Sequence, residues 1–144
     1  MRNIEGINKT VFEYSVKSRK NRVNPVIMVV EDDEVSLQML GKVVSSYGEV
    51  VEAENGVKAI KNYSLCAPDI VFLDIELPDM TGVEILAEIS AVDQDSYVIM
   101  LTSHTEAAYV KESVKRGAKG YLAKPFKKDR IEHYIKSCAA GKKG

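Results

Sequence analysis

The fold is decided by residues 26–33, which read VIMVVEDD: five apolar residues followed at once by three acids. Four of the five apolar residues are β-branched, and such a run without alternation is typical of a strand that is buried on both faces. Strands of this kind belong to parallel sheets that helices cover on each side. Glu31, Asp32 and Asp33 therefore stand at the carboxyl end of a buried strand.

Strands and helices alternate from this stretch to the end of the chain. Further apolar runs predict strands at Val50–Ala53, Ile70–Asp74, Tyr97–Thr102 and Gly120–Ala123. Apolar residues at helical spacing predict helices over Leu37–Tyr47, Val57–Leu65, Val83–Val92, Glu106–Arg116 and Asp129–Ala139. Crossovers between parallel strands are almost always right-handed, so five such units predict a doubly wound α/β domain with a five-stranded parallel sheet.

The first 24 residues differ in charge from the rest of the chain. They hold six basic and two acidic side chains, whereas the remainder holds 14 basic and 19 acidic ones. Ile4, Ile7, Val11 and Tyr14 fall at helical spacing, but residues 17–22 have the pattern of a solvated basic linker. We therefore expect an extension that is flexible or a short helix and that is dispensable for the chemistry. The expected units are an extension at 1–24, a domain at 25–140 and a tail at 141–144.

Composition excludes several classes of protein. Hydrophobic residues make up 45% of the chain and charged residues 28%, as in ordinary globular domains. No apolar run approaches the roughly 18 residues of a membrane span, and an acidic domain does not favour nucleic acid as the main partner. Cys66 and Cys138 have no metal or redox spacing, so we expect both thiols to be reduced, as in a cytoplasmic protein.

Polar residues follow four of the five strands at the point where each strand ends. In an open α/β sheet, ligands bind beyond the carboxyl ends of the strands. Besides the acids at 31–33, the residues at these ends are Asp74, Thr102, Ser103 and Lys124, and none of the polar groups considered falls at the opposite ends. Carboxylates ~5 Å apart repel by roughly 3 kcal/mol at an effective dielectric of ~20, so they require a cation.

The chemistry of this group points to phosphoryl transfer. Hard oxygen ligands with only one or two direct carboxylates suit Mg²⁺, which keeps water and is completed by a phosphate oxygen. A metal, the ammonium of Lys124 and the hydroxyl of Thr102 would surround one further carboxylate, Asp74. We therefore expect Asp74 to be the nucleophile of a phosphoryl-transfer site.

Four motifs resemble those of the response-regulator receiver family. They are the acids at 31–33, the acceptor motif FLDIELPDMTG at 72–82, the hydroxyl motif MLTS at 100–103 and the lysine motif GYLAKPF at 120–126. Together the resemblance covers about residues 26–139. It implies a flavodoxin-like fold with strand order 2-1-3-4-5.

The resemblance also implies a metal site. Asp32 and Asp74 would bind Mg²⁺ directly, together with the backbone carbonyl of Glu76. Glu31, which stands where many members have Asp, would act through a water molecule. Glu76 and His104 flank the site and are expected to set how long the phosphoryl group survives.

Further roles implied by the resemblance concern the switch. Lys124 would pair with Asp74 and then with the phosphoryl group, and Thr102 would donate its hydroxyl to a phosphoryl oxygen. Tyr121 would be the aromatic residue whose rotamer follows Thr102. The Lys124–Pro125 peptide bond is expected to be cis, because a tight turn there aims the ammonium at Asp74.

The implied protein is a stand-alone receiver, a signalling domain rather than an enzyme, although it would promote its own phosphorylation and dephosphorylation. Its phosphoryl donor would be a histidine kinase or a phosphotransfer protein. Phosphorylation would act on the face made by the fourth helix, fifth strand and fifth helix of the domain, which is also the expected surface for a homodimer. Two alternatives stay open: a pseudo-receiver that serves only as a binding scaffold, and a flavin-binding electron carrier of the same fold, which three acids after the first strand disfavour.

Overall fold

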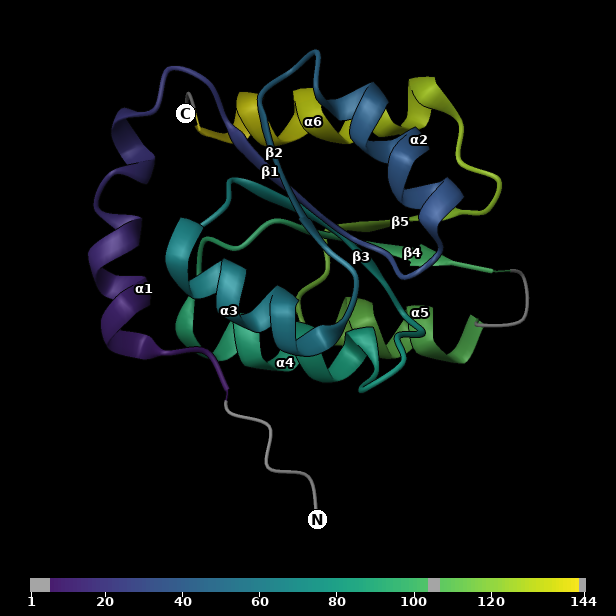
Figure 1. Cartoon of the computed structure of the whole chain (residues 1–144), viewed down its shortest axis with the longest axis horizontal. Helices are drawn as coiled ribbons and strands as arrows, with labels where there is room; N and C mark the ends of the chain where they lie inside the picture. Colours follow the sequence, from purple (N-terminus) through teal and green to yellow (C-terminus); the bar gives the residue numbers. More distant parts are fainter. Residues whose placement is uncertain (1–5, 104–106, 143–144) are drawn as a thin grey trace.

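The computed structural model describes residues 6–103 and 107–142 (Figure 1). Its strands are β1 Val26–Val30, β2 Glu49–Ala53, β3 Ile70–Asp74, β4 Val98–Thr102 and β5 Gly120–Ala123. Its helices are α1 Lys9–Val16, the 3₁₀ helix η1 Arg19–Asn21, α2 Glu34–Val44, α3 Gly56–Cys66, α4 Gly82–Val92, α5 Ala107–Lys115 and α6 Lys128–Lys142. None of the described helices is long and apolar enough to cross a bilayer.

The five strands form one parallel sheet in the order β2-β1-β3-β4-β5, which confirms the predicted fold. Helices α2 and α6 cover one face of the sheet, and α3, α4 and α5 cover the other (Figure 1). Every residue of β1, β3 and β4 is buried, because these central strands have helices on both sides. Their carboxyl ends consequently meet at one edge of the sheet.

The observed elements differ little from the predicted ones. Strands β1, β3 and β5 have the predicted bounds. Helix α2 ends at Val44, three residues earlier than the apolar spacing suggested, and the N–H of Tyr47 instead bonds the Val44 carbonyl in the following turn. Tyr47 still packs against the core from that turn, so its apolar character indicated burial and not helix.

Side-chain caps explain where the helices begin. Asp33 accepts a hydrogen bond from the Ser36 N–H at the start of α2, and Asn55 does the same for Lys58 at the start of α3. The peptide bond between Lys124 and Pro125 is cis, as predicted.

Within the N-terminal extension, the described residues 6–24 lie against the domain, and α1 packs next to α3 (Figure 1). Ile7 and Phe12, immediately before and four residues after the N-cap Asn8, are both buried, as in a hydrophobic staple. Tyr14, which the spacing placed on the apolar face, is 80% exposed. The prediction of a solvated linker at residues 17–22 is wrong for Arg19 and Arg22, since both side chains form ion pairs with buried carboxylates of the domain.

Candidate functional site

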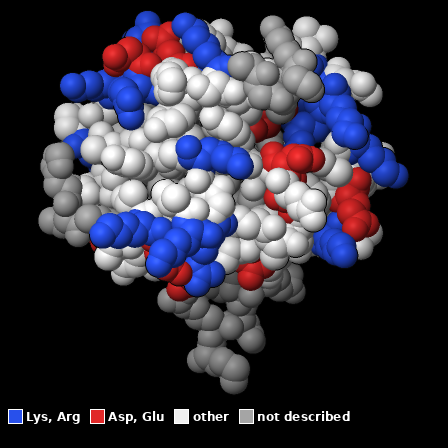
Figure 2. Space-filling view, turned by 180° about the vertical axis from the view of Figure 1, so that it is seen from behind, with Lys and Arg blue, Asp and Glu red and all other residues white. Residues whose placement is uncertain are grey.

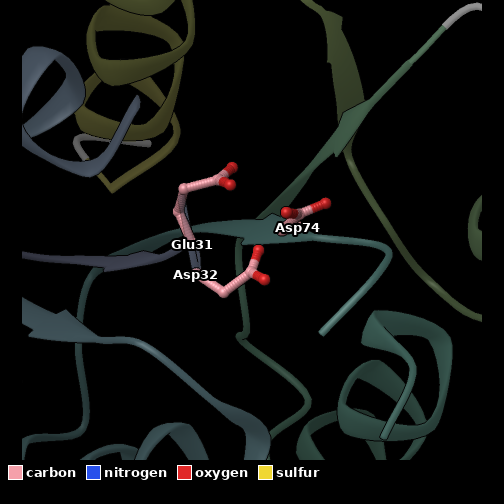
Figure 3. Close-up of side chains that lie close together, drawn as sticks. All are labelled: Glu31, Asp32 and Asp74. Carbon is pink, nitrogen blue, oxygen red and sulfur yellow. The ribbon is translucent and has the colours of Figure 1, made fainter. Parts of the chain in front are cut away.

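Three carboxylates converge at the carboxyl edge of the sheet. Glu31 and Asp32 directly follow β1, and Asp74 is the last residue of the neighbouring strand β3. One oxygen atom from each lies within 4.8 Å of those of the other two, and the side chains lie close together in Figure 3. Glu31 and Asp74 are buried, whereas Asp32 is exposed. The cluster is therefore closed toward the core and open toward solvent.

Lys124, which follows β5, supplies a cation to this cluster. Its Nζ atom lies 3.2 Å from Glu31 Oε2 and 3.5 Å from Asp74 Oδ2. The sequence indicated a pair of Lys124 with Asp74, and the structure adds Glu31 as the nearer carboxylate. One ammonium thus serves two buried carboxylates, which leaves the cluster with an excess of negative charge.

This excess of negative charge shifts the pKa values of Asp74 and Lys124. Burial, and then the charge of Glu31, raise the pKa of Asp74 to about 7. Burial lowers the pKa of Lys124, but Asp74 and Glu31 raise it by more, so the ammonium stays charged. Among the residues that the structure describes, none donates a hydrogen bond to the buried Glu31 Oε2, although the Lys124 Nζ atom lies 3.2 Å from it.

The site fits a divalent cation with a preference for oxygen. Its donors are carboxylate oxygens, one of them lacks a hydrogen-bond donor, and its exposed side admits water. These are the features of a Mg²⁺ site. The Glu76 N–H donates to Asp74 Oδ1 over 3.2 Å, which places the backbone of Glu76 beside the cluster. That the Glu76 carbonyl binds the metal stays a prediction.

The two predicted switch residues lie on the neighbouring strands. Thr102 ends β4 and is buried, and its hydroxyl donates to the Ser103 carbonyl over 2.8 Å. Tyr121 lies in β5 opposite Met100 and is 48% exposed. The structure thus brings Thr102 to the same edge as Asp74 and holds Tyr121 in an outward position. His104 lies outside the described residues.

Asp79 is a residue of the site region that the sequence did not reveal. Its carboxylate accepts hydrogen bonds from the N–H groups of Gly56 and Val57, over 2.7 and 2.9 Å, at the start of α3. It thereby ties the segment after Asp74 to this helix. Gly82 closes the same segment, and a Cβ atom there would lie 2.2 Å from the Asp74 carbonyl oxygen, so only glycine fits. In a sequence, an acidic residue after a proline looks the same whether it caps a helix or lies in a solvated turn. The role of Asp79 could therefore not be recognised from the sequence.

Comparison with known proteins agrees with the geometry. Residues 27–136 match the family model of the response regulator receiver domain. The chemotaxis protein CheY of Listeria monocytogenes is 38% identical over 115 residues, which cover 78% of this chain and 97% of that protein. The sporulation initiation phosphotransferase F of Bacillus subtilis is 33% identical over 115 residues, which cover 79% of this chain and 93% of that protein.

Solved structures show the same fold. A response regulator receiver domain protein from Clostridium thermocellum superposes with a TM-score of 0.79 at 26% identity and covers 83% of this chain and 97% of its own. The beryllofluoride-activated DrrB receiver domain superposes with a TM-score of 0.76 at 27% identity, over 82% of this chain and 99% of its own. The family match begins at residue 27, so the N-terminal extension lies outside it.

Proposed function

The chain belongs to the response regulator receiver domain family, and we propose that it accepts a phosphoryl group on Asp74 in a Mg²⁺-dependent reaction. The donor is a histidine kinase or a phosphotransfer protein. The observation that carries this proposal is the excess of carboxylates around one lysine at the carboxyl edge of the sheet. The Lys124 ammonium is the cation beside both buried carboxylates, 3.2 Å from Glu31 Oε2 and 3.5 Å from Asp74 Oδ2, and a bound metal would supply the missing positive charge.

Each residue has a distinct part in the proposed reaction. An ionised Asp74 oxygen attacks the phosphorus atom, the bond from phosphorus to the donor breaks, and an acyl phosphate forms. Lys124, already 3.5 Å from Asp74, pairs with the phosphoryl oxygens. Thr102 turns its hydroxyl from the Ser103 carbonyl to a phosphoryl oxygen. When bound at Asp32 and Asp74, Mg²⁺ supplies positive charge that neutralises the incoming phosphoryl oxygens.

The raised pKa of Asp74 explains why the reaction needs the metal. Only the deprotonated carboxylate is a nucleophile, and burial beside Glu31 keeps a substantial share of Asp74 protonated near neutral pH. A cation at the cluster favours the ionised form of Asp74 instead. The proposed metal dependence thus follows from the close approach of the buried carboxylates Glu31 and Asp74.

Phosphorylation is proposed to shift the population of conformers on the face of α5, β5 and α6. Tyr121, now about half exposed, would rotate inward when Thr102 moves toward the phosphoryl group. Residues 108–139 carry nine Lys and Arg against three Asp and Glu, whereas residues 26–103 carry three against 15. Figure 2 looks onto the β5 side and shows several groups of Lys and Arg around a broad uncharged area, with smaller groups of Asp and Glu beside them. This charge favours an acidic target over a homodimer that would place two basic faces together.

Incubation with acetyl phosphate and Mg²⁺ tests the proposal. We expect the intact mass to rise by one phosphoryl group, hydroxylamine to remove the label as it does from an acyl phosphate, and EDTA to prevent labelling. Asp74→Asn should abolish the label. Asp129→Asn, which removes an acid in the first turn of α6, is the matched control and should be labelled normally. A labelled Asp74→Asn variant would refute the acceptor assignment, and a native chain without label would favour the scaffold alternative.

A further inference from the structure

Helix α3 is held at its two ends by segments that are far apart in the sequence. Its first residues contact the segment at 74–82, here called the acceptor loop, which contains Asp74 and Asp79. Its last residues contact the extension at 6–22, here called the N-terminal clasp. The clasp lies outside the family match, so this second attachment is an addition to the receiver domain.

The attachment to the acceptor loop is tight. Both carboxylate oxygens of Asp79 are used, one for each of the first two N–H groups of α3. A carboxylate at this place also complements the positive end of the helix dipole. Gly56 lies so close to Met80 that a Cβ atom would come within 2.2 Å of its side chain. A displacement of the start of α3 would therefore break its hydrogen bonds with the acceptor loop.

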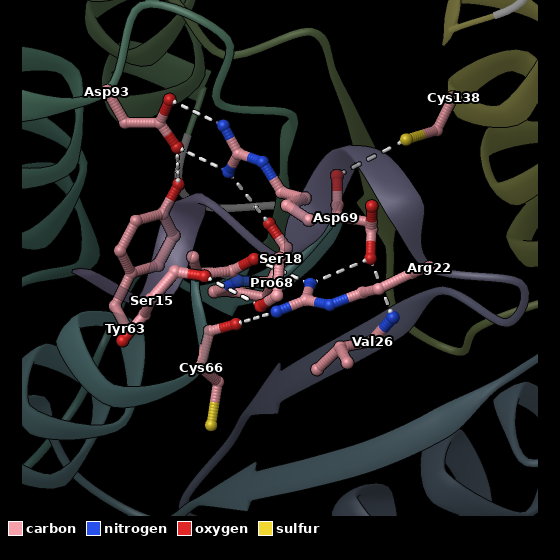
Figure 4. Close-up of polar contacts among 12 residues, drawn as sticks. Ser15, Ser18, Arg22, Val26, Tyr63, Cys66, Pro68, Asp69, Asp93 and Cys138 are labelled. Carbon is pink, nitrogen blue, oxygen red and sulfur yellow. Dashed lines mark hydrogen bonds and ion pairs between the residues drawn. The ribbon is translucent and has the colours of Figure 1, made fainter. Parts of the chain in front are cut away.

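The attachment to the clasp uses backbone groups at the end of α3 (Figure 4). Arg22 donates to the carbonyls of Cys66 and Ala67 and forms an ion pair with Asp69, its Nη1 atom 3.0 Å from Oδ2. The Asn8 N–H donates to Ser64 Oγ over 3.0 Å.

A buried network adds the link to α4. Arg19 forms two parallel hydrogen bonds with the Asp93 carboxylate, over 2.8 and 3.0 Å, and the Tyr63 hydroxyl donates to the same carboxylate. Asp93 caps the end of α4, where a negative charge is unfavourable unless a cation lies beside it. The side chains of Arg19 and Asp93 are only 9% and 3% exposed. Loss of the arginine would leave a buried carboxylate short of donors.

We propose that Arg19 is a positioning residue for the phosphoryl site: the docked clasp holds α3 in the position at which Asp79 fixes the acceptor loop. This inference rests on the proposed function of Asp74. The clasp has two states, docked and released, and only the docked state keeps α3 attached at both ends. A ligand that binds the ordered acceptor loop therefore favours the docked clasp, and the docked clasp favours the ligand by the same factor.

Beryllofluoride with Mg²⁺ is the probe for the phosphoryl site, since a receiver domain of the same fold has been activated with it. Its dissociation constant, followed by fluorine NMR, should rise about fivefold in Arg19→Ala, the lower end of typical coupling between sites. Trypsin cleavage within residues 17–22 reports release of the clasp. In the native chain, saturating Mg²⁺ and beryllofluoride should slow this cleavage by about the same factor.

Two further variants keep the test independent of folding. Arg116→Ala removes an arginine from an exposed ion pair with Glu112 and should change neither readout. Asn8→Ala removes the N-cap of α1 but leaves the Arg19–Asp93 pair, so it should release the clasp in part and weaken the probe by less. If the released clasp leaves probe affinity unchanged in both clasp variants, and the probe does not protect the native clasp, the coupling is refuted. Failure of the native chain to bind the probe would instead refute the function of Asp74.

Discussion

Buried carboxylates occupy both ends of this sheet, and their surroundings differ. At the carboxyl ends of the strands, Glu31 and Asp74 share one lysine, and burial beside Glu31 raises the pKa of Asp74 to about 7. At the opposite ends, Asp69 and Asp93 each have an arginine of their own. Hydrogen bonds from Arg19 and Tyr63 outweigh the effect of burial on Asp93 and lower its pKa.

The difference separates a site built for a ligand from one built for stability. Both pairs of acids are almost inaccessible to solvent, so burial alone does not mark function. What distinguishes the proposed phosphoryl site is missing charge compensation, which a metal and a phosphoryl group could complete. Asp69, which immediately precedes β3, was not among the polar residues considered in the sequence, and it shows that a buried carboxylate also lies at the opposite end of the sheet.

The largest effect is expected from Asp93→Ala, which removes one partner of the compensated pair. Arg19 would be left without its carboxylate in a mostly buried position. Breaking a buried ion pair in this way typically costs about 3–5 kcal/mol. Urea denaturation should show this loss in the free energy of unfolding. A cost below about 1 kcal/mol, the usual value for exposed pairs, would mean that the clasp contributes little to the fold.

At the proposed phosphoryl site, we expect a substitution to raise the free energy of unfolding instead of lowering it. Asp74→Asn removes a charge from a cluster that has too much of it, while the amide oxygen still accepts the Glu76 N–H. We expect this variant to stabilise the metal-free domain by about 1–3 kcal/mol at about pH 8, since each unit of pKa shift corresponds to about 1.4 kcal/mol. The measurement is urea denaturation in EDTA. A destabilised variant would mean that Asp74 is compensated as well as Asp93.

The two ends should also respond to pH in opposite directions. Because folding raises the pKa of Asp74 to about 7, the native state binds a proton there more tightly, and stability should rise as pH falls toward that value and below it. Folding lowers the pKa of Asp93, so its contribution is present above the ordinary aspartate pKa and is lost as pH falls through the lowered value.

Unfolding of the metal-free chain, measured from about pH 8 to about pH 3, should therefore show a maximum of stability at mildly acidic pH. Asp74→Asn should flatten the upper limb of this profile, and Asp93→Asn should reduce the slope of the lower one. A profile in which Asp74→Asn leaves the upper limb unchanged would contradict the raised pKa.

The smallest effect on stability is expected at an exposed ion pair, which serves as a reference for the buried ones. Arg116 and Glu112 form an ion pair over 2.8 Å, as short as the contact between Arg19 and Asp93, but both side chains are nearly half exposed. Arg116→Ala should cost less than about 0.5 kcal/mol in urea denaturation, because solvent screens the pair. An effect as large as that of Asp93→Ala would show that pairing, and not burial, sets the cost.

Local patterns were enough to predict the sheet and the edge at which the site lies. The apolar run before Glu31 predicted β1 residue by residue, and Asp74 was located because a carboxylate ends an otherwise apolar strand. Since all strands are parallel, their carboxyl ends share one edge, and the strand order implied by the family resemblance places the ends of β1 and β3 side by side. A helix cap such as Asp33 is also predictable from local sequence, because it depends only on residues within one turn.

The partners of the buried charges were decided by the tertiary structure alone. Arg19 and Asp93 are 74 positions apart, and Lys124 and Glu31 are 93 positions apart. In the sequence, Arg19 has the same appearance as the exposed Lys17 and Lys20 beside it. Burial selects between them: a carboxylate taken out of water needs a cation at hydrogen-bond distance, and only the folded chain determines which basic side chain can reach it.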